Sequence, residues 1–230
     1  MTNYDFSKHL FRCSQLPILM KKSKKTGELS ETTKSLLDEI YIEKVFLRKK
    51  IIVSKYLEKG NKKENESISL YRKLTQVFCK KNDEVYQNNY LIGTPDLILD
   101  YTVIDIKTCW DIFTFFKKDE KSAHDDYYWQ LYAYAWLCDK SSMQLAYCLV
   151  DNDEFTIFDE FKKIKYGLGL DDESPELSEI EAQLVTNNQY TDLKINQKIK
   201  IYNFEFDKKL KEQVVKQLKL CREYLNNLQF

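Results

Sequence analysis

The sequence predicts an α/β fold in which a mixed central β-sheet is flanked by helices. Helical patterns fill the first third of the chain, and two apolar strands follow one another within residues 89–108. From there to the C-terminus, helical and strand patterns alternate. Helices, then a hairpin, then further helices and strands imply a mixed sheet with helices on its faces.

The length and composition indicate one globular domain. The chain has 230 residues, of which 43% are hydrophobic and 31% charged, and this suffices for a single core. We expect one domain over residues 1–230, with a helical part at about 1–85, a central core at about 86–160 and a C-terminal elaboration at about 161–230. No apolar run is as long as a membrane span and the N-terminus carries no signal-peptide pattern. A cytoplasmic protein without a membrane partner is therefore expected.

The charges are unevenly placed although the formal net charge is zero. Residues 1–63 carry 15 Lys and Arg against 7 Asp and Glu, whereas residues 151–183 carry 11 acidic residues against 3 lysines. A basic face opposite an acidic one suits DNA binding, because neutralising phosphates supplies most of the sequence-independent affinity. A solvated surface of mixed charge is the alternative.

The cysteines do not indicate a metal site. None of the six is spaced as Cys-x-x-Cys and the chain has only two histidines, so zinc is poorly supported. An iron–sulfur cluster near the C-terminus would need a group of cysteines, and only Cys221 lies there. We expect reduced thiols.

The first third of the chain has helical patterns. Residues 20–30 are polar and contain a glycine, which indicates a loop. Apolar residues recur at helical spacing over 31–50, with Ser30 or Thr32 as the N-cap.

A second helical region follows. Residues 52–58 predict a short helix, Gly60 is expected to end it, and residues 64–79 predict another helix.

Residues 89–108 change to strand character. The segment LIGTPDLILD predicts one apolar strand entered through a Gly-Thr-Pro turn. Tyr101 and Thr102 then lead into VIDIKT, a second strand. The two strands predict a hairpin.

The rest of the chain alternates between helix and strand. Residues 125–138 predict an aromatic-rich helix with Asp125 or Asp126 as its cap, and 143–150 a strand. Residues 154–161 are a possible further strand.

Three segments complete the chain. Residues 161–190 are acidic and indicate a loop, and residues 199–206 alternate as a strand. The last 24 residues predict an amphipathic helix.

Asp105 and Lys107 are the first candidate site residues. They stand two apart in the strand IDIKT, so their side chains share a face, roughly 6.6 Å apart along the strand. Ile104 and Ile106 face the opposite way, into a core. A carboxylate and an ammonium placed in this way can hold a metal ion and position its water, although an acid-x-Lys triplet also arises by chance in a chain this rich in charge.

Asp96 is the second candidate. It opens the preceding strand, and pairing across the hairpin can bring it beside Asp105. Two carboxylates at one end of a sheet repel unless a cation neutralises them. Oxygen ligands suit Mg²⁺ or Mn²⁺. The alternative is a pair of solvated turn aspartates.

Gln130 and Tyr134 are the third element. Their i, i+4 spacing places both on one face of the aromatic-rich helix. The amide and the hydroxyl suit a phosphate or a lysine as partners. A buried helix in which Gln130 is incidental is the alternative.

The order of these motifs resembles the PD-(D/E)XK nuclease superfamily. Gly-x-Pro-Asp at 93–96, Asp-x-Lys-Thr at 105–108 and Gln-x-x-x-Tyr at 130–134 follow the pattern of the QxxxY branch, which includes RecB-like nucleases and phage lambda exonuclease or YqaJ-like proteins. The resemblance implies a restriction-endonuclease-like core. Asp105 stands where relatives more often have Glu, and the chain beyond about residue 134 matches nothing specific.

Two upstream matches extend the resemblance. Gly-x-x-x-Glu at 60–64 implies that Glu64 is the upstream carboxylate that assists metal or water binding, with Glu66 and Glu43 as alternatives. Arg12 and Ser14 resemble the N-terminal segment in which lambda-type exonucleases carry a serine that meets the 5′ phosphate of DNA. A hydroxyl at a helix start can donate to a phosphate, but an ordinary N-cap explains Ser14 equally well.

The resemblance implies Mg²⁺- or Mn²⁺-dependent phosphodiester hydrolysis. Asp96, Asp105 and the Ile106 carbonyl would hold one ion, and Glu64 would help with a second. Lys107 would orient or deprotonate the attacking water, with a proton affinity lowered by the metal.

The resemblance also implies a substrate and partners. Gln130 and Tyr134 would fix the scissile strand of linear duplex DNA. A single-strand annealing protein and further copies of the chain are possible partners in phage-type recombination or repair in the host cytoplasm. A structure-specific endonuclease of the same superfamily and a non-catalytic DNA-binding module remain alternatives.

Overall fold

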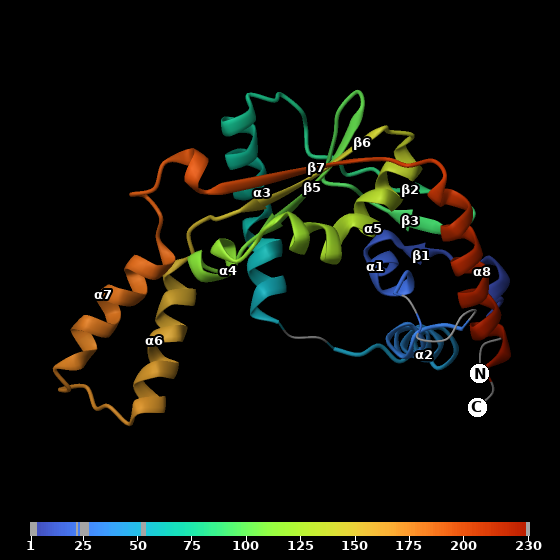
Figure 1. Cartoon of the computed structure of the whole chain (residues 1–230). Helices are drawn as coiled ribbons and strands as arrows, with labels where there is room; N and C mark the ends of the chain where they lie inside the picture. The colour runs from blue at the N-terminus through green and yellow to red at the C-terminus, as the bar shows by residue number, and fades with distance from the viewer. Residues whose placement is uncertain (1–3, 22, 24–27, 52–53, 229–230) are drawn as a thin grey trace.

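The computed structural model describes residues 4–21, 23, 28–51 and 54–228 (Figure 1). Its main sheet has four strands in the order β4-β5-β6-β7. The strands are β4 (Leu97–Ile98), β5 (Thr102–Thr108), β6 (Ser142–Cys148) and β7 (Ile199–Glu205). β5 and β6 run parallel, whereas β4 and β7 are antiparallel to their neighbours. The predicted α/β class with a mixed sheet flanked by helices is therefore confirmed.

A smaller sheet joins the N-terminal segment to the centre of the chain. It consists of β1 (Phe11–Arg12), β3 (Leu91–Gly93) and β2 (Tyr86–Gln87), in that order. β1 pairs with β3 in parallel, with Arg12 opposite Ile92. This pairing brings the N-terminal segment next to the turn that leads into β4.

Helices cover both faces of the main sheet. On one face, α5 (Glu120–Cys138) packs over a cluster that includes Val103 and Leu145. On the other, α3 (Lys55–Thr75) packs over a second cluster that includes Ile104 and Ile106. The side chains of β5 thus alternate between two covered faces, with Val103 on the α5 side and Ile104 and Ile106 on the α3 side.

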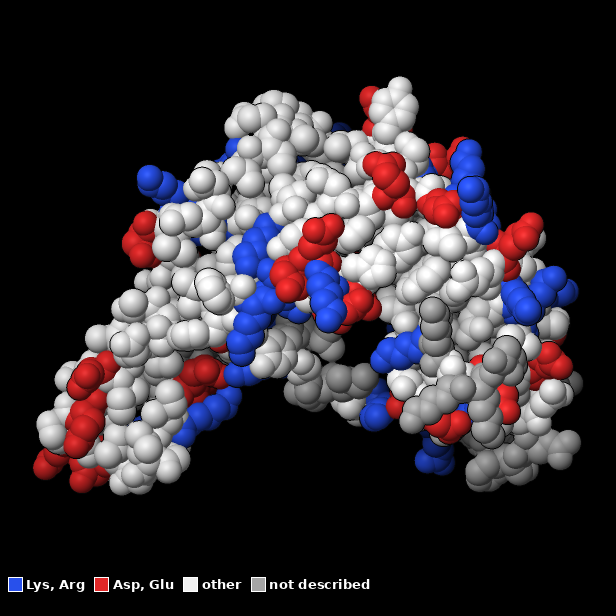
Figure 2. All heavy atoms as spheres, in the orientation of Figure 1, with Lys and Arg blue, Asp and Glu red and all other residues white. Residues whose placement is uncertain are grey.

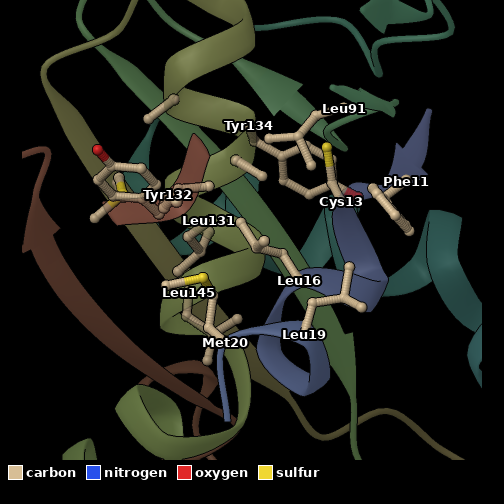
Figure 3. Packing of buried hydrophobic residues seen from close by; sticks show 14 of the residues in the cluster. Phe11, Cys13, Leu16, Leu19, Met20, Leu91, Leu131, Tyr132, Tyr134 and Leu145 are labelled. Carbon is tan, nitrogen blue, oxygen red and sulfur yellow. The ribbon is translucent and has the colours of Figure 1, made fainter. Parts of the chain in front are cut away.

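The other helices complete the body and an arm. They are η1 (Phe6–Lys8), η2 (Cys13–Gln15), α1 (Leu16–Leu19), α2 (Glu31–Val45), α4 (Ile112–Phe116), α6 (Glu154–Leu168), α7 (Glu176–Asn188), η3 (Ile195–Gln197) and α8 (Leu210–Asn227). Figure 3 shows Phe11, Leu16 and Leu19 from the N-terminal segment packing toward Leu131 of α5.

The arm is formed by α6 and α7, which extend together away from the sheet (Figure 1). Acidic side chains gather at its outer end on the face shown in Figure 2. Like charge would repel a phosphate backbone from this part of the surface. None of the helices in the described ranges is long and apolar enough to cross a bilayer.

Several predicted elements are confirmed. α2 begins after Ser30, whose hydroxyl accepts a hydrogen bond from the Thr33 N–H at 3.2 Å. The hairpin forms in the expected register, with Leu97 opposite Ile104. β6, β7 and α8 lie where their patterns place them, and the α8 stripe is buried at Val214, Leu218, Cys221 and Leu225.

The predicted break at Gly60 was wrong. Gly60 does not end a helix, because α3 runs through it from Lys55 to Thr75. No atom lies within 4 Å of the place of a Cβ there, and one glycine costs a helix only about 1 kcal/mol. The short helix expected at 52–58 is the start of α3, except for residues 52 and 53, which lie outside the described residues. Of the loop expected at 20–30, residues 22 and 24–27 also lie outside them.

The strand expected over LIGTPDLILD is in fact two. β3 and β4 belong to different sheets and are separated by Thr94, Pro95 and Asp96. Proline lacks the N–H that a continuing ladder needs, so the chain turns between the two sheets.

The predicted start of α5 and the predicted strand at 154–161 were also wrong. α5 begins earlier than expected, because Asp119 rather than Asp125 or Asp126 caps it, accepting from the Ser122 N–H at 2.7 Å. The strand expected at 154–161 is the first half of α6, which Asp153 caps.

Most of the acidic loop expected at 161–190 is also helical, in α6 and α7. Gly169 ends α6 in the left-handed conformation with φ 67°. The true loop is the short acidic link between the two helices.

Gly93 is expected to be intolerant of a side chain. A Cβ there would lie 2.6 Å from Cys13 Sγ and 2.8 Å from Tyr134 Cε1, and both neighbours are buried. Gly93→Ala should lower the free energy of unfolding by about 1–3 kcal/mol, as overpacking does. Gly60→Ala is the matched control and should raise it by about 0.5–1 kcal/mol. Urea denaturation measures both, and equal stability of Gly93→Ala and the wild type would contradict the close packing described here.

Candidate active site

Asp105 and Lys107 project from the same face of β5, as their spacing predicts. Their side chains form an ion pair, with Lys107 Nζ 2.7 Å from Asp105 Oδ2. Asp105 is only 1% exposed, which is rare for a carboxylate and is costly without compensating charge. Lys107 is more open, with 26% of its side chain exposed.

Asp96 lies across the hairpin from Asp105. The register that pairs Leu97 with Ile104 places these two aspartates opposite each other. Asp96 Oδ2 accepts a hydrogen bond from the Ile106 N–H at 2.6 Å. Burial and the neighbouring Asp105 carboxylate raise the pKa of Asp96 to about 7, although the Ile106 hydrogen bond and Lys107 oppose this shift.

Lys107 is held between carboxylates and an aromatic ring. Burial by itself would lower the pKa of its ammonium, but the charges of Asp105 and Asp96 outweigh burial and the pKa is raised. The ammonium also lies 4.9 Å from the centre of the Tyr127 ring, within cation–π range. In this metal-free state Lys107 is therefore a cation at neutral pH.

Gln130 and Tyr134 lie behind Asp105. Gln130 Nε2 donates to Asp105 Oδ1 at 3.3 Å and contacts the Tyr134 hydroxyl at 3.1 Å. Both side chains are buried, at 6% and 7% exposure. The sequence suggested a phosphate or a lysine as their partner, whereas the structure gives Gln130 the carboxylate of Asp105.

Glu64 lies on the α3 wall of the same cleft. Its carboxylate pairs with Lys81, with Nζ 2.9 Å from Oε2. Of the alternative upstream acids, Glu66 pairs with Lys63 on the exposed side of α3, and Glu43 lies on α2. Only Glu64 of these three lines the cleft that contains Asp96.

The cleft lies at the end of β5, between α3 and the start of α5. It has a volume of about 660 Å³. Its lining residues are Tyr56, Leu57, Gly60, Asn61, Glu64, Asp96, Ile106, Lys107, Thr108, Cys109, Trp110, Thr114, Lys118, Tyr127 and Tyr147. Acidic and basic groups are thus gathered at one end of a partly aromatic cleft, a setting typical of catalytic sites.

The donor set fits a hard divalent cation. Asp96 and Asp105 offer carboxylate oxygens and Ile106 a main-chain carbonyl, the ligands that Mg²⁺ and Mn²⁺ prefer. Asp105 Oδ2 is buried, and the Lys107 ammonium at 2.7 Å is its partner within the described residues. Among the described residues, no three His, Cys, Asp or Glu side chains lie close enough together to form a metal site on their own. Mg²⁺ commonly binds through one or two carboxylates and keeps several waters, so Asp96 and Asp105 suffice.

The N-terminal candidates lie near this site. Arg12 and Ser14 are both exposed, on β1 and in η2. The intervening Cys13 packs against Gly93 and Tyr134 (Figure 3). Ser14 lies within a short 3-10 turn rather than capping a long helix, so its hydroxyl, and not a helix field, is what this segment offers to an anion.

Lys81 is the charged group that the sequence analysis missed. It lies in an irregular segment before β2, where no periodicity or motif marks it. Its partner Glu64 is 17 residues away on a helix. Only the folded arrangement of α3 against this segment reveals the pair.

The fold has clear relatives among solved structures, although no family model and no curated protein matches the sequence. A phage-related exonuclease from Haemophilus somnus 129PT superimposes with a TM-score of 0.75 and 21% identity, covering 95% of this chain and 94% of that one. An alkaline exonuclease from Laribacter hongkongensis gives a TM-score of 0.63 and 10% identity over 96% and 89% of the two chains. The same exonuclease in complex with dAMP gives 0.61 and 11%, with the same coverage.

These likenesses extend over nearly the whole chain, including the segments beyond residue 134 that no motif covered. The chain therefore has the fold of phage-related and alkaline exonucleases, and the resemblance to PD-(D/E)XK nucleases that its motifs predicted is confirmed at the level of the fold.

Proposed function

We propose that the chain is a metal-dependent deoxyribonuclease that hydrolyses phosphodiester bonds of linear duplex DNA from its ends. The observation that carries the proposal is that Asp96 and Lys107 line one cleft while the buried Asp105 lies opposite Asp96 and pairs with Lys107. The fold supports it, because the similar structures are exonucleases and one of them is a complex with dAMP.

Asp96, Asp105 and the Ile106 carbonyl are the proposed ligands. A divalent ion bound there would supply Lewis-acid activation of a water and of the phosphate. Lys107 is raised in pKa, so in the metal-free state it is an ammonium that can orient water or offset phosphate charge. Deprotonation of Lys107 would require the ion to reverse that shift.

Gln130 and Tyr134 are proposed to position Asp105. The Gln130 amide fixes one oxygen of that carboxylate, and Tyr134 holds the amide in turn. Supported in this way, a buried carboxylate keeps one orientation, which metal ligands generally need. A contact with the DNA strand would require both side chains to move from their buried positions.

An exonuclease that acts at 5′ ends is proposed on the position of Arg12 and Ser14. Cys13, which lies between these exposed residues, packs against Gly93, three residues before Asp96. A terminal phosphate held by a hydroxyl and a guanidinium would set the register of the strand. The structure-specific endonuclease is the second candidate, because the Asp96–Asp105–Lys107 site is common to both. A non-catalytic DNA-binding module is disfavoured by the intact cluster of charges.

The biological setting is proposed on the same basis. A phage-type recombination or repair enzyme in the host cytoplasm could act beside a single-strand annealing protein or as a homo-oligomer. The acidic arm formed by α6 and α7 is a surface on which protein partners are favoured over DNA.

Removal of either central charge should abolish cleavage. With Mg²⁺ present, wild type should degrade linear duplex DNA and spare covalently closed circles. Asp105→Asn and Lys107→Met should each lower the rate by about a hundredfold or more, because they remove a proposed metal ligand and the cation beside it. DNA affinity measured with Ca²⁺ should persist. Near-normal turnover in either variant would exclude the assigned site.

Glu64→Gln and Glu66→Gln form a matched pair within this experiment. Both substitutions remove one carboxylate from α3, but only Glu64 lines the cleft. Glu64→Gln should slow cleavage, whereas Glu66→Gln should retain the wild-type rate. The reverse order would move the upstream acid to Glu66.

Asp96 should make the metal-free protein less stable as the pH rises. Its pKa is about 7 in the folded chain against an ordinary 3.8, so the folded state holds an extra proton between about pH 4 and pH 7. That stabilisation is complete below about pH 4 and is lost as the pH rises through 7. The helix-capping carboxyls of Asp119 and Asp153, whose pKa values are lowered, titrate below this window.

Buried His9, whose pKa is lowered to about 4, contributes stability that rises with pH up to about 6.5 and opposes this trend. Thermal melting in EDTA should therefore give a Tm whose fall is clearest above about pH 6.5. Asp96→Asn should flatten the dependence. Mg²⁺ or Mn²⁺ should raise the Tm more at the higher pH, where no proton competes, and either ion should be required for cleavage. Ca²⁺ should bind but inhibit, because it prefers looser coordination. Full activity in EDTA, or a pH dependence unchanged by Asp96→Asn, would contradict the metal site.

A terminal 5′ phosphate should accelerate digestion through Ser14. The test compares one duplex with 5′-phosphate and 5′-hydroxyl ends, digested by wild type and by Ser14→Ala. Wild type should prefer the phosphate by about tenfold, the equivalent of one charge-assisted hydrogen bond, and Ser14→Ala should lose most of the preference. Equal rates for both ends in both proteins, with nicked circles cut as fast as linear DNA, would establish the endonuclease instead.

A further inference from the structure

Lys81 forms an ion pair with Glu64, a carboxylate that lines the cleft. Its ammonium lies 2.9 Å from Glu64 Oε2, and Glu64 lines the same cleft as Asp96. The side chains of Lys81 and Glu64 are 36% and 32% exposed. Exposed ion pairs of this kind are weak, so a stronger cation can replace the lysine.

The segment that carries Lys81 is fastened to the catalytic turn. The Asn82 N–H donates to the Asp96 carbonyl at 2.8 Å. The Asn82 side-chain amide donates to the carbonyls of Pro95 and Glu84, each at 3.0 Å. These bonds fix the Lys81 backbone next to Asp96 whatever its side chain does.

The charges of the site explain why the pair forms. Glu64, Asp96 and Asp105 bring three carboxyl groups together with two ammonium groups. Lys107 pairs with Asp105 and Lys81 with Glu64, while Asp96 has no ion pair within the described residues and relies on the Ile106 N–H. An incoming divalent cation and the Lys81 ammonium therefore compete for the same negative charge.

We propose that Lys81 is the resident counter-ion of Glu64 in the metal-free protein, and that it binds a DNA phosphate after a divalent ion draws Glu64 away. The inference rests on the proposed nuclease function. Once released, the Lys81 ammonium remains tethered through Asn82 beside Asp96, so its charge stays next to the proposed metal site. A lysine is suited to such a role, because it offers a mobile point charge rather than a fixed fork of donors.

Lys81→Met should strengthen the binding of Mg²⁺ and weaken the binding of DNA. Without the competing ammonium, the DNA-free variant should bind Mg²⁺ about two- to fivefold more tightly, as expected for loss of one weak ion pair. The same variant should bind linear duplex DNA more weakly in Ca²⁺. The slope of its log affinity against log salt should be smaller by about one, the signature of one lost phosphate contact. Titration calorimetry and a salt series of DNA binding measure the two effects.

Two further variants serve as controls. Lys80→Met changes the net charge equally at the exposed neighbouring position and should alter neither affinity. Lys81→Arg keeps the charge and should retain the wild-type salt slope. Thermal melting of each variant reports whether it is folded.

Each outcome decides a different point. Tighter Mg²⁺ binding with weaker DNA binding in Lys81→Met alone supports the exchange. Unchanged or weaker Mg²⁺ binding in Lys81→Met would show a purely structural ion pair and overturn it, as would an unchanged salt slope. If wild type itself neither binds Mg²⁺ nor cleaves DNA, the proposed function fails and the exchange fails with it. A wild type that binds and cleaves, with an inert Lys81, overturns the exchange alone.

Discussion

The juxtaposition of Asp96 and Asp105 across the β4–β5 hairpin is the constraint on which the site depends. Two like charges at the end of a sheet, one of them 1% exposed, oppose folding unless their surroundings compensate. The compensating contacts come from two elements: the Ile106 N–H and Lys107 from β5, and Gln130 from α5. The compensation is incomplete, as the raised pKa of Asp96 records. The Asp96 and Asp105 carboxylates are therefore expected to attract a cation.

The support of Asp105 by α5 also constrains how the core packs. α5 can support Asp105 only if its polar pair faces the sheet, and the rest of that helix face must then pack without voids. Tyr134 reaches its place because Gly93 leaves room for its ring and for Cys13. The N-terminal segment is thereby packed against the support of the catalytic carboxylate, so the exposed Ser14 has a rigid base. Tyr134 thus takes part both in the packing of the core and in the support of Asp105. Substitutions in this part of the core should therefore be tolerated less well than substitutions in the cluster under α3.

The sequence predicted the parts of this arrangement that depend on local periodicity and failed where long-range packing decides. Two-residue alternation and a turn suffice to predict that Asp96 lies opposite Asp105, because register in a hairpin is a local property. Residues 154–161 are apolar at spacings that suit both a strand and a helix, and the helix forms because α7 provides a partner face and Asp153 a cap. Lys81 had no signal, since an ion pair between an irregular segment and a helix has no period.

The charges of the cleft act as one linked system rather than as separate residues. A proton on Asp96, the ammonium of Lys81 and a divalent ion all neutralise the same group of carboxylates, so occupancy by one lowers the affinity for the others. Lys107 is raised in pKa by the same charges that would bind the ion, and it loses that support when they are neutralised. A metal held by Asp96 and Asp105 would therefore both expel protons and make Lys107 more acidic. The same cluster that is costly to fold would thus couple the binding of a metal ion to the protonation states of Asp96 and Lys107.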